Sequence, residues 1–108
     1  MAIKIAIFNS KSAWNPDKQL TTMKWQGFSS EVNPQMKQNL EDGIVFRLAF
    51  DTPEPDNQYA VICIVEDVAS GKMRFGRVVT RHTDYLDISG GHVNGGQRNL
   101  VFTVLVIT

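Results

Sequence analysis

Apolar and polar residues alternate with a period of two over much of the chain, a pattern typical of half-buried β-strands. Residues rich in β-branched and aromatic side chains strengthen the same prediction. Five segments are predicted as strands on these grounds: 2–8, 43–51, 58–67, 72–82 and 99–108. A β-rich protein is therefore expected.

The last predicted strand is apolar on both of its faces. Leu100, Phe102, Val104 and Val106 lie on one face, and Val101, Leu105 and Ile107 lie on the other. The first strand is similar, with Ile3, Ile5 and Ile7 on one strongly apolar face and Ala2, Ala6 and Phe8 on the second. A strand in a two-layer antiparallel fold normally leaves one face in water. We therefore expect the second faces to be covered, either within the chain or by self-association or strand addition.

Turn signals separate the predicted strands. Ser70 and Gly71 indicate a hairpin, and the prolines and aspartates of 51–58 indicate a surface loop. Residues 34–42 are predicted as a short helix begun by Asn33 and Pro34, although a strand followed by a turn also fits. The sequence thus predicts one all-β domain over residues 1–108, a small antiparallel β-sandwich or barrel of 5–7 strands with at most one short helix.

Composition narrows the function classes. The 108 residues carry eleven basic and eleven acidic side chains, and this neutrality argues mildly against nucleic acid as the partner. Cys63 is the single cysteine, so no intrachain disulfide can form, which suits a reducing compartment. The first residues turn polar too soon for a secretory signal, and no apolar run approaches the ~20 residues needed to cross a bilayer. We expect a cytoplasmic protein without a membrane partner.

The stretch DISGGHVNGGQRN, residues 87–99, holds four of the eight glycines. A phosphate-binding loop needs a helix after its glycines, whereas a strand is predicted here, so we interpret the stretch as a connection of the kind found at long hairpin tips. Metal ligation is the other reading, with His82, Asp84, Asp87 and His92 as ligand types. The two histidines are ten residues apart, and no metal or other cofactor is predicted.

Catalysis is not predicted. Cys63 lies within YAVICIV, where a small buried side chain is the simplest interpretation. The carboxylates that could form an acid–base pair fall mostly in turns or caps; they are Glu31, Glu41, Asp42, Asp51, Glu54 and Asp56. We expect a protein that is not an enzyme.

Basic and aromatic residues alternate in the segment 72–85. Arg74, Phe75, Arg77, Arg81 and His82 are what a single-stranded nucleic-acid-binding strand would use, with charges along the phosphates and rings on the bases. The pleat puts the arginines on two faces unless Gly76 marks a bulge. An edge strand protected by charge is the competing interpretation.

Aromatic residues in polar surroundings give the leading hypothesis. Trp14, Trp25, Phe28 and Tyr85 are predicted anchors of a protein-binding or inhibitor-like β module. In this hypothesis the C-terminal strand pairs with itself or with a partner, giving a homo-oligomer or a complex. Nucleic-acid binding through 72–85 is the alternative, and carbohydrate binding by the tryptophans is a further one.

Overall fold

The computed structural model describes residues 2–9, 21–29, 35–40, 43–68, 70–90 and 100–108. These residues form two antiparallel sheets and no helix, which confirms the all-β class. The five-stranded sheet contains β1 (Ile3–Asn9), β2 (Thr21–Gln26), β5 (Ala60–Asp67), β6 (Lys72–Phe75) and β9 (Leu100–Ile107). The four-stranded sheet contains β3 (Gln35–Leu40), β4 (Gly43–Ala49), β7 (Arg77–Arg81) and β8 (Tyr85–Ser89).

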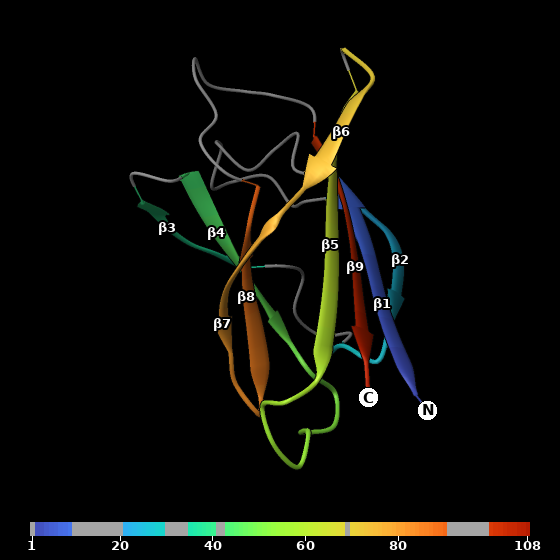
Figure 1. The fold of residues 1–108 in the computed structure, drawn as a ribbon, viewed down its shortest axis with the longest axis vertical. Helices are drawn as coiled ribbons and strands as arrows, with labels where there is room; N and C mark the ends of the chain where they lie inside the picture. The colour runs from blue at the N-terminus through green and yellow to red at the C-terminus, as the bar shows by residue number, and fades with distance from the viewer. Residues whose placement is uncertain (1, 10–20, 30–34, 41–42, 69, 91–99) are drawn as a thin grey trace.

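The strand order is β2-β1-β9-β5-β6 in one sheet and β3-β4-β8-β7 in the other. The antiparallel pairs β1–β2, β3–β4, β5–β6 and β7–β8 follow one another along the chain and alternate between the two sheets. β9 then returns to lie between β1 and β5. Figure 1 shows the two layers side by side, with both chain ends at one end of the five-stranded sheet. The fold is a small β-sandwich.

Aromatic and aliphatic side chains from both sheets meet in the space between them. Phe8 and Phe102 are directly paired in the register of β1 and β9, and their rings stack with centroids 5.0 Å apart. Phe46 of β4 meets both rings edge-on, at centroid distances of 5.4 and 5.3 Å. Leu48, Leu86 and Ile88 of the four-stranded sheet are fully buried around them. This cluster joins the two layers.

The sequence leaves a short helix and a strand followed by a turn open for residues 34–42, and the described residues 35–40 form the strand. Gln35–Leu40 is the strand β3, which pairs with β4, for example at Gln35 with Arg47. Met36 and Leu40 are four residues apart, a spacing that suits one face of a helix, whereas in β3 the extra residue Lys37 interrupts the alternation and they pair with Phe46 and Gly43. Pairing with β4 decides between the two, because sheet hydrogen bonds override a weak local helix preference.

The predicted strand 72–82 is divided at Gly76 into β6 and β7, which belong to different sheets. Figure 1 shows them as one path that crosses from layer to layer. The Gly76 amide donates to the Cys63 carbonyl at 2.7 Å. A Cβ at this position would lie 2.4 Å from Cys63 Sγ and 3.2 Å from the Ser89 carbonyl oxygen. The absence of a side chain therefore lets the chain cross close to β5 and β8.

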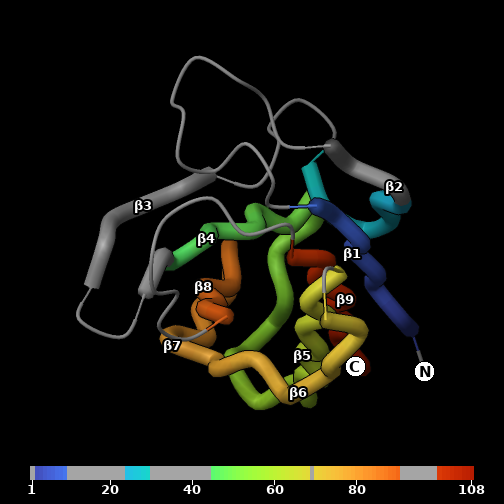
Figure 2. The backbone as a smooth tube through the Cα atoms, turned by 90° about the horizontal axis from the view of Figure 1, so that it is seen from above, coloured from blue at the N-terminus to red at the C-terminus, as the bar shows by residue number. Residues whose placement is uncertain are grey.

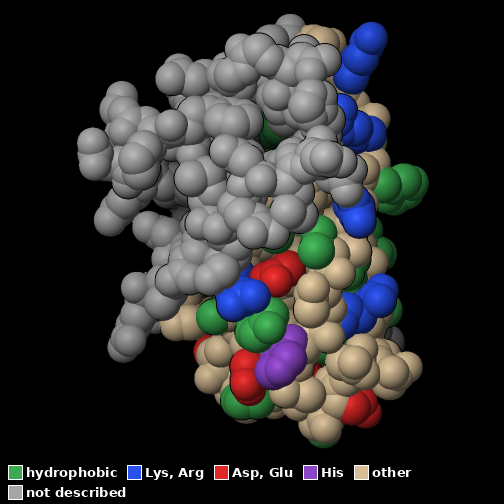
Figure 3. Space-filling view, turned by 90° about the vertical axis from the view of Figure 1, so that its left-hand side faces the viewer, with side chains coloured by type: hydrophobic (Ala, Val, Ile, Leu, Met, Phe, Trp, Pro, Cys, Tyr) green, Lys and Arg blue, Asp and Glu red, His purple; other side chains and the backbone are tan. Residues whose placement is uncertain are grey.

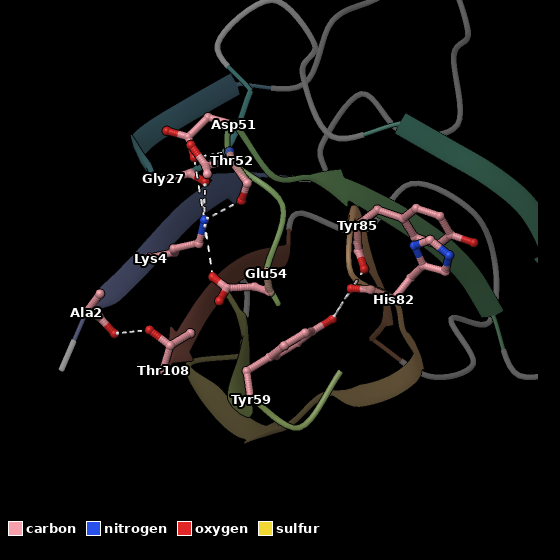
Figure 4. A network of polar contacts seen from close by, with 10 residues as sticks. All are labelled: Ala2, Lys4, Gly27, Asp51, Thr52, Glu54, Tyr59, His82, Tyr85 and Thr108. Carbon is pink, nitrogen blue, oxygen red and sulfur yellow. Dashed lines mark hydrogen bonds and ion pairs between the residues drawn. The ribbon is translucent and has the colours of Figure 1, made fainter. Parts of the chain in front are cut away.

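Lys4 links the end of β1 to the segment that connects β4 with β5 (Figure 4). Its ammonium group donates to the Thr52 carbonyl at 3.1 Å and pairs with Glu54 at 3.3 Å and Asp51 at 3.5 Å. The side chains of Lys4 and Glu54 are only 11% and 12% exposed. A charge removed from water this far needs partners, and here the inward-facing lysine of β1 has them.

Gly76→Ala should destabilise the protein, because the new methyl group cannot be placed without displacing Cys63 or Ser89. We expect the free energy of unfolding to fall by about 1–3 kcal/mol, measured as the urea midpoint by circular dichroism. In a Cys63→Ala background the same substitution should cost less, since the nearest atom is gone. An unchanged midpoint in both backgrounds would contradict the close crossing.

Candidate interaction face

The five-stranded sheet turns the more apolar side of β1 away from the core. Ala6 and Phe8 are fully buried between the sheets, whereas Ile3 is 51% exposed on the opposite side. The same alternation holds in β9, where Phe102 and Val104 are buried and Thr103 and Leu105 are half-buried. The outward side chains of this sheet are called the outer face below. In the orientation of Figure 2, no described element lies on this side of the sheet.

Strand register arranges the outer face in four rows that run across the sheet. The Phe75 row is Lys24, Ile7, Thr103, Ile64 and Phe75. The Ile62 row is Gln26, Ile5, Leu105 and Ile62. The Ile3 row is Ile3, Ile107 and Ala60. The Glu66 row is Asn9, Val101, Glu66 and Met73. Apolar side chains thus run across β1, β9 and β5, and two of the rows end on an apolar residue of β6.

The outer face is more open to solvent than its composition would suggest. Phe75 is 80% exposed, Met73 63% and Ile62 39%. With strands about 4.8 Å apart and about 3.3 Å per residue, the four rows cover about 400 Å². That is within the range of the largest apolar patch on an ordinary monomer, and such patches are often binding sites. The outer face is therefore the candidate functional surface.

The edges of the two sheets are, by contrast, protected against strand addition. β2, β3 and β7 each carry one extra residue relative to the neighbouring strand, namely Met23, Lys37 and Val79. The fourth edge strand, β6, spans four residues. Bulged or very short edge strands are poor templates for another chain. The expectation of strand addition at the C-terminal strand is wrong, because the backbone of β9 pairs with β1 on one side and β5 on the other.

The predicted anchors are spread over the molecule. Phe28 is 3% exposed and packs between Trp25 and Phe50. Trp25 is half-buried, and its indole N–H donates to the Ser29 carbonyl at 2.7 Å. Trp14 lies outside the described residues. Trp25 and Phe28 therefore contribute to packing beside the core.

Tyr85 belongs to a separate cluster on the four-stranded sheet. Its ring lies 3.7 Å from the Arg47 guanidinium and stacks on His82 with centroids 4.5 Å apart. Arg47 also donates two hydrogen bonds to the buried Asp87, at 2.9 and 3.0 Å. The hydrogen bond to Asp87 raises the pKa of Arg47. Figure 3 shows that the coloured part of this side of the molecule mixes charged, polar and apolar groups.

The residues predicted to bind nucleic acid are all exposed but divided between the sheets. Arg74 and Phe75 are in β6, and Arg77 and Arg81 are in β7. Arg74 donates to the Gly90 carbonyl. The bulge expected at Gly76 lies instead at Val79, the extra residue of β7. No single stripe of charge joins these residues along one strand.

The glycine-rich stretch joins β8 and β9, which lie in different sheets, so it is not the tip of a hairpin. Residues 91–99, with His92, lie outside the described part of the chain. Of the proposed ligands, Asp87 is paired with Arg47, and His82 Nδ1 accepts the Asp84 amide at 3.1 Å. Among the described residues, no group of three or more His, Cys, Asp or Glu could hold a metal ion.

Comparison with protein-family models found no match, and comparisons with curated proteins and with solved structures found none either. Within the described residues, no helix is long and apolar enough to cross a membrane. Function must therefore be argued from the surface itself. Of the outward residues of β5 and β6, the sequence predicts only Phe75 as a site residue, and for nucleic acid. The signal that could have found them is the doubly apolar pattern of β1, β5 and β9, read together.

Cys63 should behave as a buried thiol. Burial raises its pKa from 9.0 to about 11, so we expect slow reaction with a disulfide reagent at pH 8 in the native protein and fast reaction in urea. The unfolded thiol ionises first as the pH rises. Its contribution to stability is therefore complete below pH 9 and is lost towards pH 11, by up to about 3 kcal/mol. Comparing urea midpoints with Cys63→Ala isolates this term, and identical pH profiles would contradict it.

Proposed function

We propose that this protein is a non-catalytic protein-binding β module that self-associates through the outer face of its five-stranded sheet. The observation that carries the proposal is the set of outward apolar side chains across β1, β9 and β5, together with the exposed Phe75 and Met73 of β6. Burying such side chains is favourable by about 1.5–3 kcal/mol each when burial is complete. We place the protein in the cytoplasm, because its single cysteine suits a reducing compartment.

Because the edge strands oppose pairing with another chain, the face of a sheet is the surface through which association can occur. The bulges of β2, β3 and β7 oppose edge-to-edge pairing. Face-to-face packing uses side chains alone and leaves the backbone ladders intact, as in the interior of a β-sandwich. Trp25 and Phe28 are occupied in packing, so the proposal depends on the outer face and not on them.

Ile62→Lys tests the proposal. Ile62 points outward and is 39% exposed, so a lysine there is tolerated in an isolated subunit but puts a charge inside the proposed contact. We expect light scattering after size exclusion to give a dimer or larger species for the unaltered chain and a monomer for the variant.

Thr80→Lys is the matched control, because Thr80 is exposed on β7 of the other sheet. This variant should keep the mass of the unaltered protein. A monomeric unaltered chain throughout a concentration series, or an Ile62→Lys variant that keeps the larger mass, would refute the proposal.

Single-stranded nucleic-acid binding is the second candidate function. It is favoured by the 80% exposure of Phe75 beside the basic residues Arg74, Arg77 and Arg81, which are all exposed. An exposed ring can stack on a base while cations contact phosphates. Carbohydrate binding by the tryptophans has no comparable observation in its favour.

For this second candidate we expect labelled oligonucleotides to show steeply salt-dependent fluorescence anisotropy. Phe75→Ala and Arg77→Glu should each lower the affinity, the former by the loss of about 1–3 kcal/mol of stacking. Thr52→Glu, which adds an acidic group at an exposed position away from these residues, is the control that should bind as before. A flat anisotropy signal at low salt would exclude nucleic acid.

A further inference from the structure

We infer that two copies pack outer face to outer face about a two-fold axis parallel to β9. This inference rests on the proposed self-association and adds its geometry. Packed sheets keep their strands within about 30° of each other, and a two-fold interface must be self-complementary. Two in-plane axes meet these conditions, one along β9 and one across the strands. The residues of the four rows distinguish them.

With the axis along β9, each row lies over the same row of the second copy in reverse order. β9 then faces β9, and β1 faces β5. Ile7 meets Ile64, and Ile5 meets Ile62, so isoleucine meets isoleucine on both sides of the axis. Thr103 and Leu105 lie on the axis and meet their own copies. Apart from the Thr103 pair, apolar groups therefore face apolar groups over the centre of the contact.

The same axis also brings β2 over β6 of the second copy. Lys24 and Phe75 are the two ends of one row, so the Lys24 ammonium faces the exposed Phe75 ring, a favourable cation–π arrangement. The Lys24 ammonium of the second copy thus covers Phe75, which is the most exposed aromatic ring of the described residues.

Glu66 completes the charge pattern. Glu66 lies over Asn9 of the second copy, whose side-chain amide can donate a hydrogen bond to the carboxylate. Lys24 of the second copy is one strand and one row away from Glu66. The long lysine side chain can span this diagonal, so opposite charges approach each other twice in the symmetric pair. Within one chain Lys24 and Glu66 are three strands, or about 14 Å, apart in the sheet and do not reach each other. The complementarity therefore exists only between copies.

The axis across the strands gives a poorer fit. It exchanges the Phe75 row with the Ile62 row and the Glu66 row with the Ile3 row. Glu66 would then face Ala60, and Phe75 would face a position beyond the end of β6, which ends at Phe75. A carboxylate would be covered without a partner, which is costly, and the exposed ring would gain nothing. The axis along β9 is the arrangement that the charges and Phe75 favour.

Thiol cross-linking with a short bifunctional reagent tests this geometry in a Cys63→Ala background. Ile7→Cys and Ile64→Cys are made as separate proteins, each checked by circular dichroism and light scattering for an unaltered fold and mass. Packed sheets lie about 10 Å apart, which is too far for a direct disulfide, but two cysteine side chains that point at each other bring their sulfur atoms to about 5 Å. The axis along β9 puts position 7 of one copy over position 64 of the other, while like positions are offset by about 10 Å more across the strands. We expect a reagent that bridges sulfur atoms about 5 Å apart to give cross-linked dimers from the mixture and few from either protein alone.

The opposite result overturns the inference. The axis across the strands places position 7 over position 5 of the second copy, so Ile7→Cys would then cross-link with an Ile5→Cys protein and its mixture with Ile64→Cys would give few dimers. Absence of cross-links while Ile62→Lys still dissociates the assembly would refute the axis along β9 and leave the proposed function standing. A monomeric unaltered chain would refute both.

A charge exchange gives a second, independent measurement. Lys24→Glu and Glu66→Lys should each weaken self-association, by about tenfold for loss of a close charge pair, as measured by dilution in sedimentation equilibrium. The double variant Lys24→Glu/Glu66→Lys restores opposite charges on the diagonal and should regain most of the affinity. Additive weakening in the double variant would overturn the pairing.

Discussion

The stacked pair of Phe8 and Phe102 is the contact on which the other features depend. The two residues are register partners on adjacent strands, and Phe46 from the opposite sheet packs edge-on against both rings. Aromatic pairs of this kind contribute about 0.5–1.5 kcal/mol beyond the area that they bury. Because side chains alternate strictly along a strand, turning these two phenylalanines inward fixes the direction of every other residue on β1 and β9.

That constraint explains why an isoleucine-rich face lies outside. In β1, Ile3, Ile5 and Ile7 have the opposite parity to Phe8, so they must point away from the core whatever their hydrophobicity. Lys4 shares the inward parity and is accommodated at the end of the sheet, where Glu54 lies 3.3 Å from its ammonium group. Burying the Phe8 ring therefore turns Lys4 towards the core side of β1 and leaves Ile3, Ile5 and Ile7 on the outer face.

Sequence pattern predicts the class and five strand regions because those segments alternate or are rich in β-branched and aromatic residues. It does not predict β8, whose polar residue Asp87 is buried by its bond to Arg47 on a neighbouring strand, a contact between residues forty positions apart. Nor does it divide 72–82, since the crossing at Gly76 is set by how closely Cys63 and Ser89 approach. The outer face escapes prediction for the same reason, because the choice between two apolar sides of a strand is made by tertiary packing.

The edge strands of the sandwich oppose association with another chain, whereas the outer face favours it. The edge strands carry the irregularities that discourage another backbone, at Met23, Lys37 and Val79. The outer face carries regular register across β1, β9 and β5, and regular register is what lines side chains up in rows. A surface of aligned rows can pack against a copy of itself without breaking a hydrogen bond, whereas an added strand would have to match a bulge. Association through side chains is therefore the mode that this architecture leaves open.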